Sequence, residues 1–189
     1  MSHYKVQRRS ILLVRKSLLI PIFLVGIILS GSGLVRGEQN WKEVTSKADQ
    51  FSVLMPGEPK FTSESVKTAL GPIEAHQWMW EPSEKTAFLV MVNQYPQAHV
   101  DKVGTTALFD GAQKGGLGPS GKLRSRKDVK VEGFPGRDVV IERDGHTNFV
   151  RFFLVKNRFY QLIVTTRPSE EAALAKDIER FDNSFKLLR

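Results

Sequence analysis

The segment between residues 138 and 166 constrains the fold most, because its three runs are apolar on both alternating sets of side chains. Asp144-Gly145, the preferred pair for a two-residue hairpin turn, separates the first run from the second. Lys156-Asn157-Arg158 then turns the chain into the third run, FYQLIVTT. In the middle run the two sets are Phe149, Phe153 and Val155, and Val150, Phe152 and Leu154. The pattern predicts three consecutive antiparallel strands in a sheet that lies between two layers.

Further strands are expected in the first half of the domain. Apolar and aromatic runs at 41–44 and 51–55 predict a β-hairpin, which the breaker Pro56-Gly57-Glu58-Pro59 ends. Three more strands are expected at residues 64–68, 73–80 and 86–93, with a turn at Leu70-Gly71-Pro72. The last of them, AFLVMVNQ, is again apolar on both alternating sets and is predicted to be covered on both faces.

Two segments are predicted to form helices, one for each face of the sheet. The first, residues 101–114, has a weak apolar stripe of Val103, Ala107, Leu108 and Gly111, and Gly115-Gly116 is expected to end it. The second has Ser169 as its expected N-cap and Glu170-Glu171 in its first turn. Its stripe consists of Leu174, Ile178, Phe181 and Phe185. The sequence therefore predicts an α+β fold, with a central antiparallel sheet and helices on both faces.

The first 37 residues have the pattern of an export signal. Basic residues precede an apolar stretch at 18–29, and small residues follow it. This stretch is short of the ~20 residues that a membrane-spanning helix needs, so cleavage between residues 31 and 38 is favoured over an uncleaved signal anchor. Arg8-Arg9 resembles a twin-arginine signal, but Arg15-Lys16 interrupts the apolar run and favours general secretion. We therefore divide the chain into a leader, 1–37, and a single domain, 38–189.

The basic composition comes mostly from the leader. The chain has 28 Lys and Arg and 20 Asp and Glu, but six of the basic residues and none of the acidic ones lie in the first 37 positions. Residues 38–189 therefore carry a net charge of only +2. A near-neutral, exported domain does not have the charge of a nucleic-acid-binding protein.

Four stretches of the domain form a moderately specific set. They are FSVLMPGEP, the G-x-PGRD turn at 133–138, RFFLVKNRFYQLIVTT and IERFDNSFKLL. Together they resemble the PsbP family, extrinsic proteins of the oxygen-evolving side of photosystem II and their bacterial relatives. The resemblance implies an α/β/α sandwich, export to a periplasm or thylakoid lumen, and no enzymatic activity. It assigns no metal site and no photosystem contact to a residue of this chain, and a shared fold does not imply a shared role.

The sequence has no signature of catalysis. The chain lacks cysteine, which excludes disulfides, thiol nucleophiles and thiolate metal sites, and it has no G-x-S-x-G element. GGLGPSGK at 115–122 departs from the phosphate-loop pattern because Leu123 follows the lysine, so we expect a flexible loop there. We expect neither an enzyme nor a cofactor.

Histidines offer little basis for a metal site. No two of His76, His99 and His146 have the spacing of ligands on one strand or helix. His146, which follows the Asp144-Gly145 turn, is the one weak candidate, with Asp144 as a second ligand. Isolated histidines on surfaces or strands are far commoner than ligands, so no metal is predicted.

The segment KLRSRKDVKVE at 122–132 contains a basic ribbon, by which we mean Lys122, Arg124, Arg126 and Lys130. In an extended chain these four side chains share one face, interrupted by Asp128. They predict a docking site for an acidic protein surface or anionic headgroups, with Arg151 nearby. The simpler interpretation is favoured: a solvated edge strand whose charges prevent pairing with other strands.

The predicted function is that of an exported accessory or binding protein. It would act at the lumenal or periplasmic face of a membrane by contacting a membrane protein complex, with a photosynthetic complex as one candidate. We expect a monomer that attaches to the membrane only through an uncleaved leader. The alternative is a periplasmic protein that binds a small molecule or metal, through His146 or a groove at Trp78 and Trp80. Such tryptophan pairs more often pack under a helix.

Overall fold

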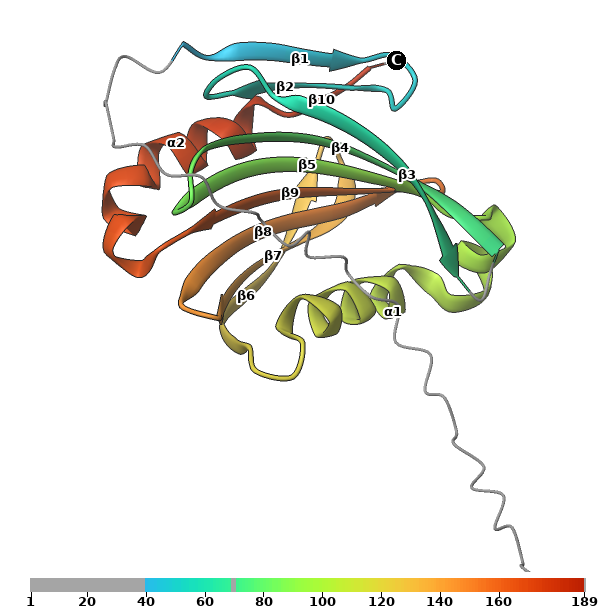
Figure 1. Ribbon diagram of the computed structural model, residues 1–189. Helices are drawn as coiled ribbons and strands as arrows, with labels where there is room; N and C mark the ends of the chain where they lie inside the picture. The colour runs from blue at the N-terminus through green and yellow to red at the C-terminus, as the bar shows by residue number, and fades with distance from the viewer. Residues whose placement is uncertain (1–39, 69–70, 189) are drawn as a thin grey trace, which may run out of the picture.

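The largest element is a seven-stranded antiparallel sheet with the strand order β3-β4-β5-β9-β8-β7-β6 (Figure 1). The computed structural model describes residues 40–68 and 71–188. Two meanders, β3 to β5 and β6 to β9, meet where β5 pairs with β9. The strands are β3 Lys60–Thr68, β4 Gly71–Ser83, β5 Thr86–Gln94, β6 Lys122–Val131, β7 Phe134–Arg143, β8 His146–Val155 and β9 Arg158–Thr166.

The predicted run of three paired strands is confirmed. β7 pairs with β8 and β8 with β9, each in antiparallel register. Asp144 and Gly145 have φ values of 53° and 76°, the positive angles that a two-residue hairpin turn of this type requires. On β8, Phe152 and Phe153 point to opposite faces and are both buried. The sheet therefore has a hydrophobic layer on each side, as the sequence pattern predicts.

A second, three-stranded sheet covers part of one face. The predicted N-terminal hairpin is confirmed as β1, Lys42–Ser46, and β2, Phe51–Met55. β10, Lys186–Leu187, joins the other side of β2 and brings the C-terminus to the N-terminal hairpin. A strand of two residues has no periodicity, so the sequence gives no sign of it.

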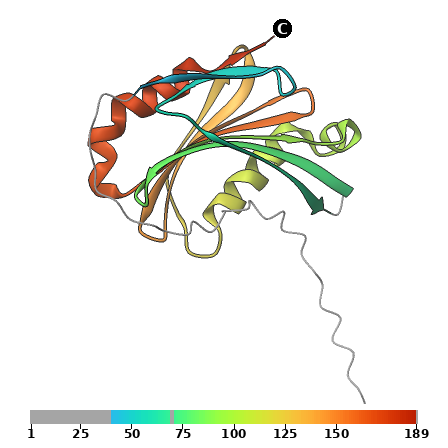
Figure 2. The same cartoon turned by 45° about the horizontal axis from the view of Figure 1, so that its top comes forward.

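Each face of the large sheet has one helix. α1, Gln97–Leu117, packs against β7 and β8, and α2, Glu171–Ser184, lies on the opposite face beside the three-stranded sheet (Figures 1 and 2). The expectation of helices on both faces agrees with this arrangement. Neither helix in residues 40–68 and 71–188 is long and apolar enough to cross a membrane. The expected signal helix falls within residues 1–39, outside the described residues.

Two predicted details of the helices are wrong. α1 continues through Gly115 and Gly116 and ends at Gly118, whose N–H bonds the carbonyls of Lys114 and Gly115 and whose positive φ turns the chain out of the helix. Ser169 is not an N-cap, because Pro168 starts a 3₁₀ turn that contains it. α2 begins one turn later, without a side-chain cap.

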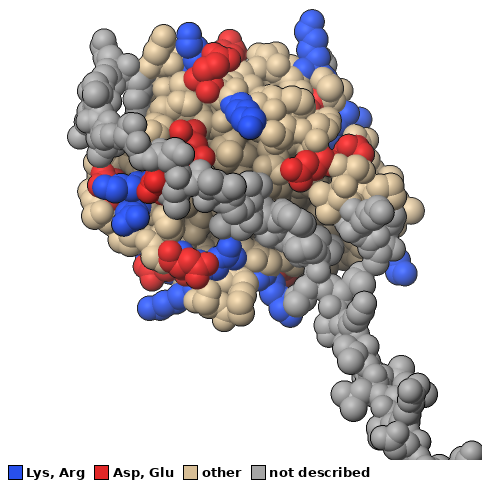
Figure 3. Space-filling view, in the orientation of Figure 1, with Lys and Arg blue, Asp and Glu red and all other residues tan. Residues whose placement is uncertain are grey.

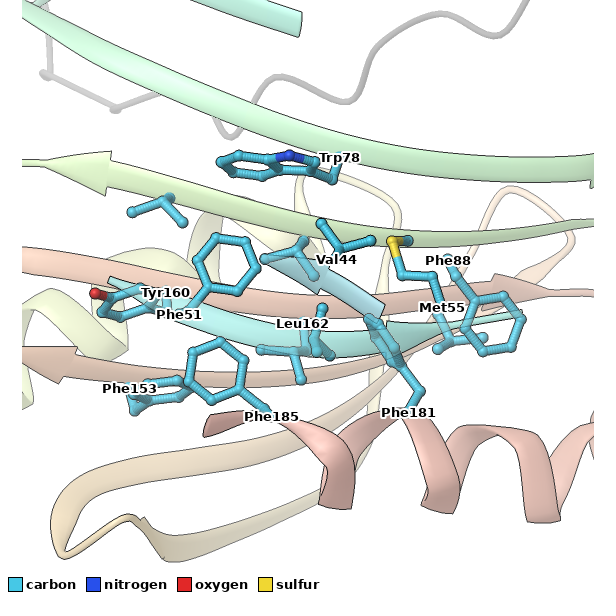
Figure 4. Packing of buried hydrophobic residues seen from close by; sticks show 14 residues of the cluster. Val44, Phe51, Met55, Trp78, Phe88, Phe153, Tyr160, Leu162, Phe181 and Phe185 are labelled. Carbon is cyan, nitrogen blue, oxygen red and sulfur yellow. The ribbon is translucent and has the colours of Figure 1, made fainter. Parts of the chain in front are cut away.

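The main core lies between the large sheet, the small sheet and α2. Figure 4 shows Phe185, just after α2, beside Phe51 and Phe153, and Phe181 of α2 on the side of Met55 and Phe88. Phe181 is 0% exposed and its ring meets that of Phe88 edge-on, with centroids 5.4 Å apart. Leu174 and Ile178 are only half-buried, so the predicted stripe of α2 is buried most deeply at its C-terminal end.

A second core lies between α1 and the other face of the sheet. Phe109 of α1 packs edge-on against Phe152, with centroids 5.2 Å apart, and also contacts Phe159. Val139 and Ile141 complete this cluster from β7. The two alternating sets of apolar side chains on the central strands therefore pack into different cores, one on each face of the sheet.

A half-buried carboxyl lies where α2 ends over the sheet. Asp182 is 3.9 Å from Nη2 of Arg151, but that guanidinium already makes two hydrogen bonds of 2.8 and 2.9 Å with Asp138. Desolvation therefore outweighs the attraction of Arg151 and raises the pKa of Asp182 to about 7, with a smaller contribution from the charge of Asp138. The folded protein holds this proton more tightly than the unfolded chain does.

We expect the unfolding free energy to depend on pH through Asp182. A carboxyl whose pKa is raised on folding stabilises the protein at low pH, and this contribution is lost as the pH rises from about 4 through 7. Because one pKa unit corresponds to about 1.4 kcal/mol, the loss should amount to a few kcal/mol. Asp182→Asn should flatten the urea-unfolding free energy across this range. An unchanged slope in the variant would show that other groups cause the pH dependence.

Candidate functional site

A cavity lies between α1 and the strands β3, β4, β5 and β9 of the large sheet. Its volume is about 250 Å³, and we call it the α1 cavity. Val103, Ala107 and Leu108 of α1 form one wall. An apolar cavity of about 150 Å³ already admits a benzene ring, so the α1 cavity is large enough for a small organic molecule.

The floor of the α1 cavity consists of two rows of side chains that cross three strands. One row runs from Gln77 on β4 through Met91 on β5 to Gln161 on β9, which are register partners. The next row is formed in the same way by Ala75, Asn93 and Phe159. Directly paired residues on antiparallel strands share a face, so all six point toward the cavity.

The floor combines apolar contacts with neutral amides. Gln77 and Gln161 are each 5% exposed, as deeply placed as Met91 at 6% between them. The amide nitrogen of Gln161 donates to Oδ1 of Asn93 at 3.3 Å and lies 3.4 Å from Sδ of Met91. Tyr95 lines one end, where burial raises the pKa of its phenol, so this group is uncharged at neutral pH.

The wall formed by α1 is interrupted at Gly104. This residue has φ 76° and ψ 160°, a backbone conformation that is essentially restricted to glycine. His99 and Val103 line the cavity from before the break, and Ala107 and Gly111 line it from after the break. α1 is therefore two helical segments, and both contribute to the cavity.

The structure divides the basic ribbon between two faces, so the prediction of one shared face is wrong. A β-bulge between Leu123 and Ser125 shifts the register of β6 against β7. Lys122 pairs with Glu142 on the α2 side, whereas Arg126 pairs with Val139 on the α1 side. Because an extra residue inverts the alternation that follows it, Lys130 lies with Arg126, away from Lys122.

Acidic neighbours also neutralise two members of the basic ribbon. Arg124 makes hydrogen bonds of 2.8 and 2.6 Å with the two carboxylate oxygens of Glu171, at the start of α2. Arg126 lies 3.8 Å from Asp110 of α1.

On the face in Figure 3, acidic and basic side chains are interspersed. Lys122 and Lys130 are exposed on β6, which is an edge strand, in agreement with the edge-protection interpretation. Docking through the ribbon stays a prediction.

Two of the three histidines of the domain have hydrogen bonds, and the third, His99, lines the α1 cavity. Nδ1 of His146 lies 3.0 Å from the backbone carbonyl oxygen of Asp144. His76 contacts the buried carboxylate of Asp49 at 2.9 Å, and Ser46 donates to the same carboxylate at 2.8 Å. Within residues 40–68 and 71–188, no three histidine or acidic side chains are grouped as metal ligands.

Trp78 and Trp80 belong to the main core and not to a groove. Trp78 is 9% exposed and its ring meets that of Phe51 edge-on at 4.9 Å. Trp80 packs on Phe88, and Gly57 lies so close to its indole that a Cβ would not fit. Both tryptophans point to the face opposite the α1 cavity, because Gln77 and Trp78 are neighbours on one strand. The packing interpretation is confirmed, with the small sheet in the place of the expected helix.

The sequence analysis missed the α1 cavity, although the strands contain a signal for it. Asn93 and Gln161 are polar positions within strands that are otherwise apolar on both faces. A buried amide in such a strand needs a hydrogen-bond partner, so its presence points to a special environment. Which face it occupies, and what lies opposite, follow only from the placement of α1.

Comparison with known proteins gives a fold and no closer relative. No family model matches the sequence, and no curated protein matches it. The domain is similar to cyanobacterial PsbP (CyanoP) from Synechocystis sp. PCC 6803, with a TM-score of 0.50 and 11% identity over 83% of this chain and 98% of that chain. It also matches the Ran-binding protein Mog1p from Saccharomyces cerevisiae, with a TM-score of 0.44 and 11% identity over 79% of this chain and 96% of that one.

A third solved structure is the protein PA94 from Pseudomonas aeruginosa, with a TM-score of 0.39 and 14% identity over 74% of this chain and 91% of that one. The likeness to CyanoP shows the fold alone, and at 11% identity it carries no information on activity or partners. The chain therefore has a PsbP-like fold, as its sequence motifs predict, and its function has to be argued from its own residues.

Proposed function

We propose that the chain is an exported, non-catalytic binding protein that holds a small, mainly apolar molecule in the α1 cavity. The observation that carries the proposal is the cavity itself: about 250 Å³, lined by apolar side chains with a few amides. This combination is typical of small-molecule sites, where apolar surface supplies affinity and a few polar groups orient the ligand. The leader supports export, and the ligand would be bound at the periplasmic or lumenal side of a membrane.

The proposal of binding without catalysis rests on the side chains that form the floor of the α1 cavity. Acid–base or nucleophilic catalysis needs paired groups with matched pKa values. The floor instead presents methionine, phenylalanine, alanine and three carboxamides, none of which exchanges a proton at neutral pH, and the titratable side chains of the lining, Glu64, Tyr95 and His99, lie outside the floor. Contact with a membrane protein complex, predicted from the sequence, is compatible with ligand binding, because the basic ribbon lies on β6, outside the residues that line the cavity.

Blocking the α1 cavity should abolish ligand binding and leave the fold intact. Ala107 lines the cavity on an exposed stretch of α1, so Ala107→Phe places a ring in the opening at little cost to folding. With N-phenyl-1-naphthylamine as a neutral fluorescent probe, we expect saturable binding of one molecule per chain by the natural protein. The variant should bind at least about tenfold more weakly, a change of 1.4 kcal/mol.

The matched control is Thr106→Phe. Thr106 is the neighbouring residue of α1, is also exposed, and is not part of the cavity lining. This variant should bind the probe as the natural protein does. Equal weakening by both substitutions, or no saturable binding by the natural protein, would contradict the proposed function.

A further inference from the structure

The three amides of the α1 cavity form a cluster around one methionine. Gln77 and Gln161 flank Met91 in one row, and Asn93 lies two residues from Met91 on the same strand and the same face. They come from three neighbouring strands, so the backbone of the sheet fixes their spacing. A buried carboxamide is costly unless its donors and acceptors are bonded, at roughly 1–3 kcal/mol for each unsatisfied group.

Part of the hydrogen-bonding capacity of this cluster is open to a ligand. Within the described part of the chain, the hydrogen bonds of Gln161 use only its amide nitrogen, toward Asn93 and Met91. Its carbonyl oxygen can therefore accept a hydrogen bond from a molecule in the cavity. The amide of Gln77, across Met91, provides both a donor and an acceptor on the same floor.

Charged ligands find no counter-charge at this floor. Among the described residues that line the α1 cavity there is no lysine and no arginine, and the one histidine, His99, lies on the α1 wall and not in the floor. The carboxylate in the lining belongs to Glu64, an exposed residue of the edge strand β3. A carboxylate or ammonium group placed among the amides would lose its hydration without gaining an ion pair. The free-energy cost of this desolvation is larger than the cost for a neutral polar group.

We infer that the α1 cavity selects small neutral amphiphiles: molecules with an aromatic or branched aliphatic body and one hydroxyl, carbonyl or amide group that bonds Gln77 and Gln161. The inference rests on the proposed function, because it assigns a ligand class to the same cavity. A hydrocarbon of the same shape fills the cavity but leaves the amides desolvated. A site with buried polar groups discriminates strongly against an analogue that cannot bond them.

The test uses four molecules that share one body and differ in one group. They are propylbenzene, 3-phenylpropan-1-ol, 3-phenylpropanoate and 3-phenylpropan-1-amine, each measured by displacement of N-phenyl-1-naphthylamine. The alcohol should bind at least about tenfold more tightly than either charged molecule, and about fivefold more tightly than propylbenzene, because it satisfies a buried hydrogen bond.

Gln161→Leu and Gln77→Leu identify the groups responsible. Each replaces a carboxamide by an apolar group of similar size, so propylbenzene should bind as well as before or better, while the preference for the alcohol disappears. Gln94→Leu is the matched control, because Gln94 is exposed on β5 and does not line the cavity. It should keep the preference. Thermal unfolding of each variant shows whether it is folded. If one of the two test variants does not fold, the other still tests the inference.

Different failures have different meanings. Equal affinity for all four molecules, or a preference for the alcohol that survives in both Leu variants, overturns the inference and leaves the α1 cavity as an unselective site. Tighter binding of the amine than of the alcohol would assign selection to Glu64 in place of the amides, and tighter binding of the carboxylate would assign it to His99. If the probe does not bind at all, the proposed function fails, and the ligand class fails with it.

Discussion

Phe181→Ala should lower the free energy of unfolding by about 3–5 kcal/mol, the range observed when a fully buried phenylalanine is truncated. Phe181 is 0% exposed and is the most deeply buried residue that α2 contributes. Its ring packs against Phe88, and its removal leaves a void between α2, the small sheet and the large sheet. Urea unfolding followed by circular dichroism gives the free-energy difference directly.

Phe61→Ala is the matched control for this prediction. The same chemical change is made on β3, where the side chain is 52% exposed. About half of its surface is already in water, so we expect a loss well under half of that at Phe181. A loss of less than 1 kcal/mol at Phe181 would mean that α2 does not anchor the main core.

Arg137→Ala should lower the free energy of unfolding by about 2–4 kcal/mol, because it removes charge-assisted hydrogen bonds of roughly 1.5–3 kcal/mol each and apolar packing. Arg137 is 2% exposed and lies on β7, because the G-x-PGRD motif, predicted as a turn, continues as strand from Phe134. Its guanidinium donates to Asp110 of α1 at 2.7 Å and to Asp128 of β6 at 2.9 Å. It also lies over the ring of Phe109, 5.5 Å from the centroid. One side chain thus joins α1, β6 and β7.

Arg126→Ala tests whether burial or charge causes this effect. Arg126 interacts with the same carboxylate of Asp110, at 3.8 Å, but its side chain is 42% exposed. Exposed ion pairs contribute little, so the loss should be below about 1 kcal/mol. Similar losses for the two arginines would show that the charge near Asp110 matters and that the position of Arg137 does not.

The sequence predicts those parts of the fold that depend on alternation along the chain. Side chains on a strand point alternately to its two faces, and this alone predicts Phe153 on one face of β8 and Phe152 on the other. The turn at Asp144-Gly145 follows from the need for positive φ at both positions. The hydrophobic positions of α2 follow from helical spacing, although their depth of burial does not, since Ile178 is half-buried and Phe181 fully buried.

Features that depend on distant partners are not visible in the sequence. The bulge at Arg124 is set by the pairing of β6 with β7, and it splits the basic ribbon that simple alternation predicts. β10 exists because the chain end meets β2, which lies more than a hundred residues earlier. The α1 cavity depends on where α1 crosses the sheet, and nothing within the helix sequence specifies that position. Export, the leader and the absence of catalysis stay predictions from the sequence.

The junction of the two meanders at β5 and β9 has a consequence for the order of folding. Each meander consists of hairpins that form from local contacts, whereas Met91 and Gln161 are separated by 70 positions and meet only after a long loop closes. The floor of the α1 cavity is divided by this junction, with Gln77 and Met91 on one side and Phe159 and Gln161 on the other. It is therefore completed only by the slowest pairing step. A bound ligand would have to dissociate before β5 and β9 separate. Ligand binding should therefore slow unfolding more than it speeds folding.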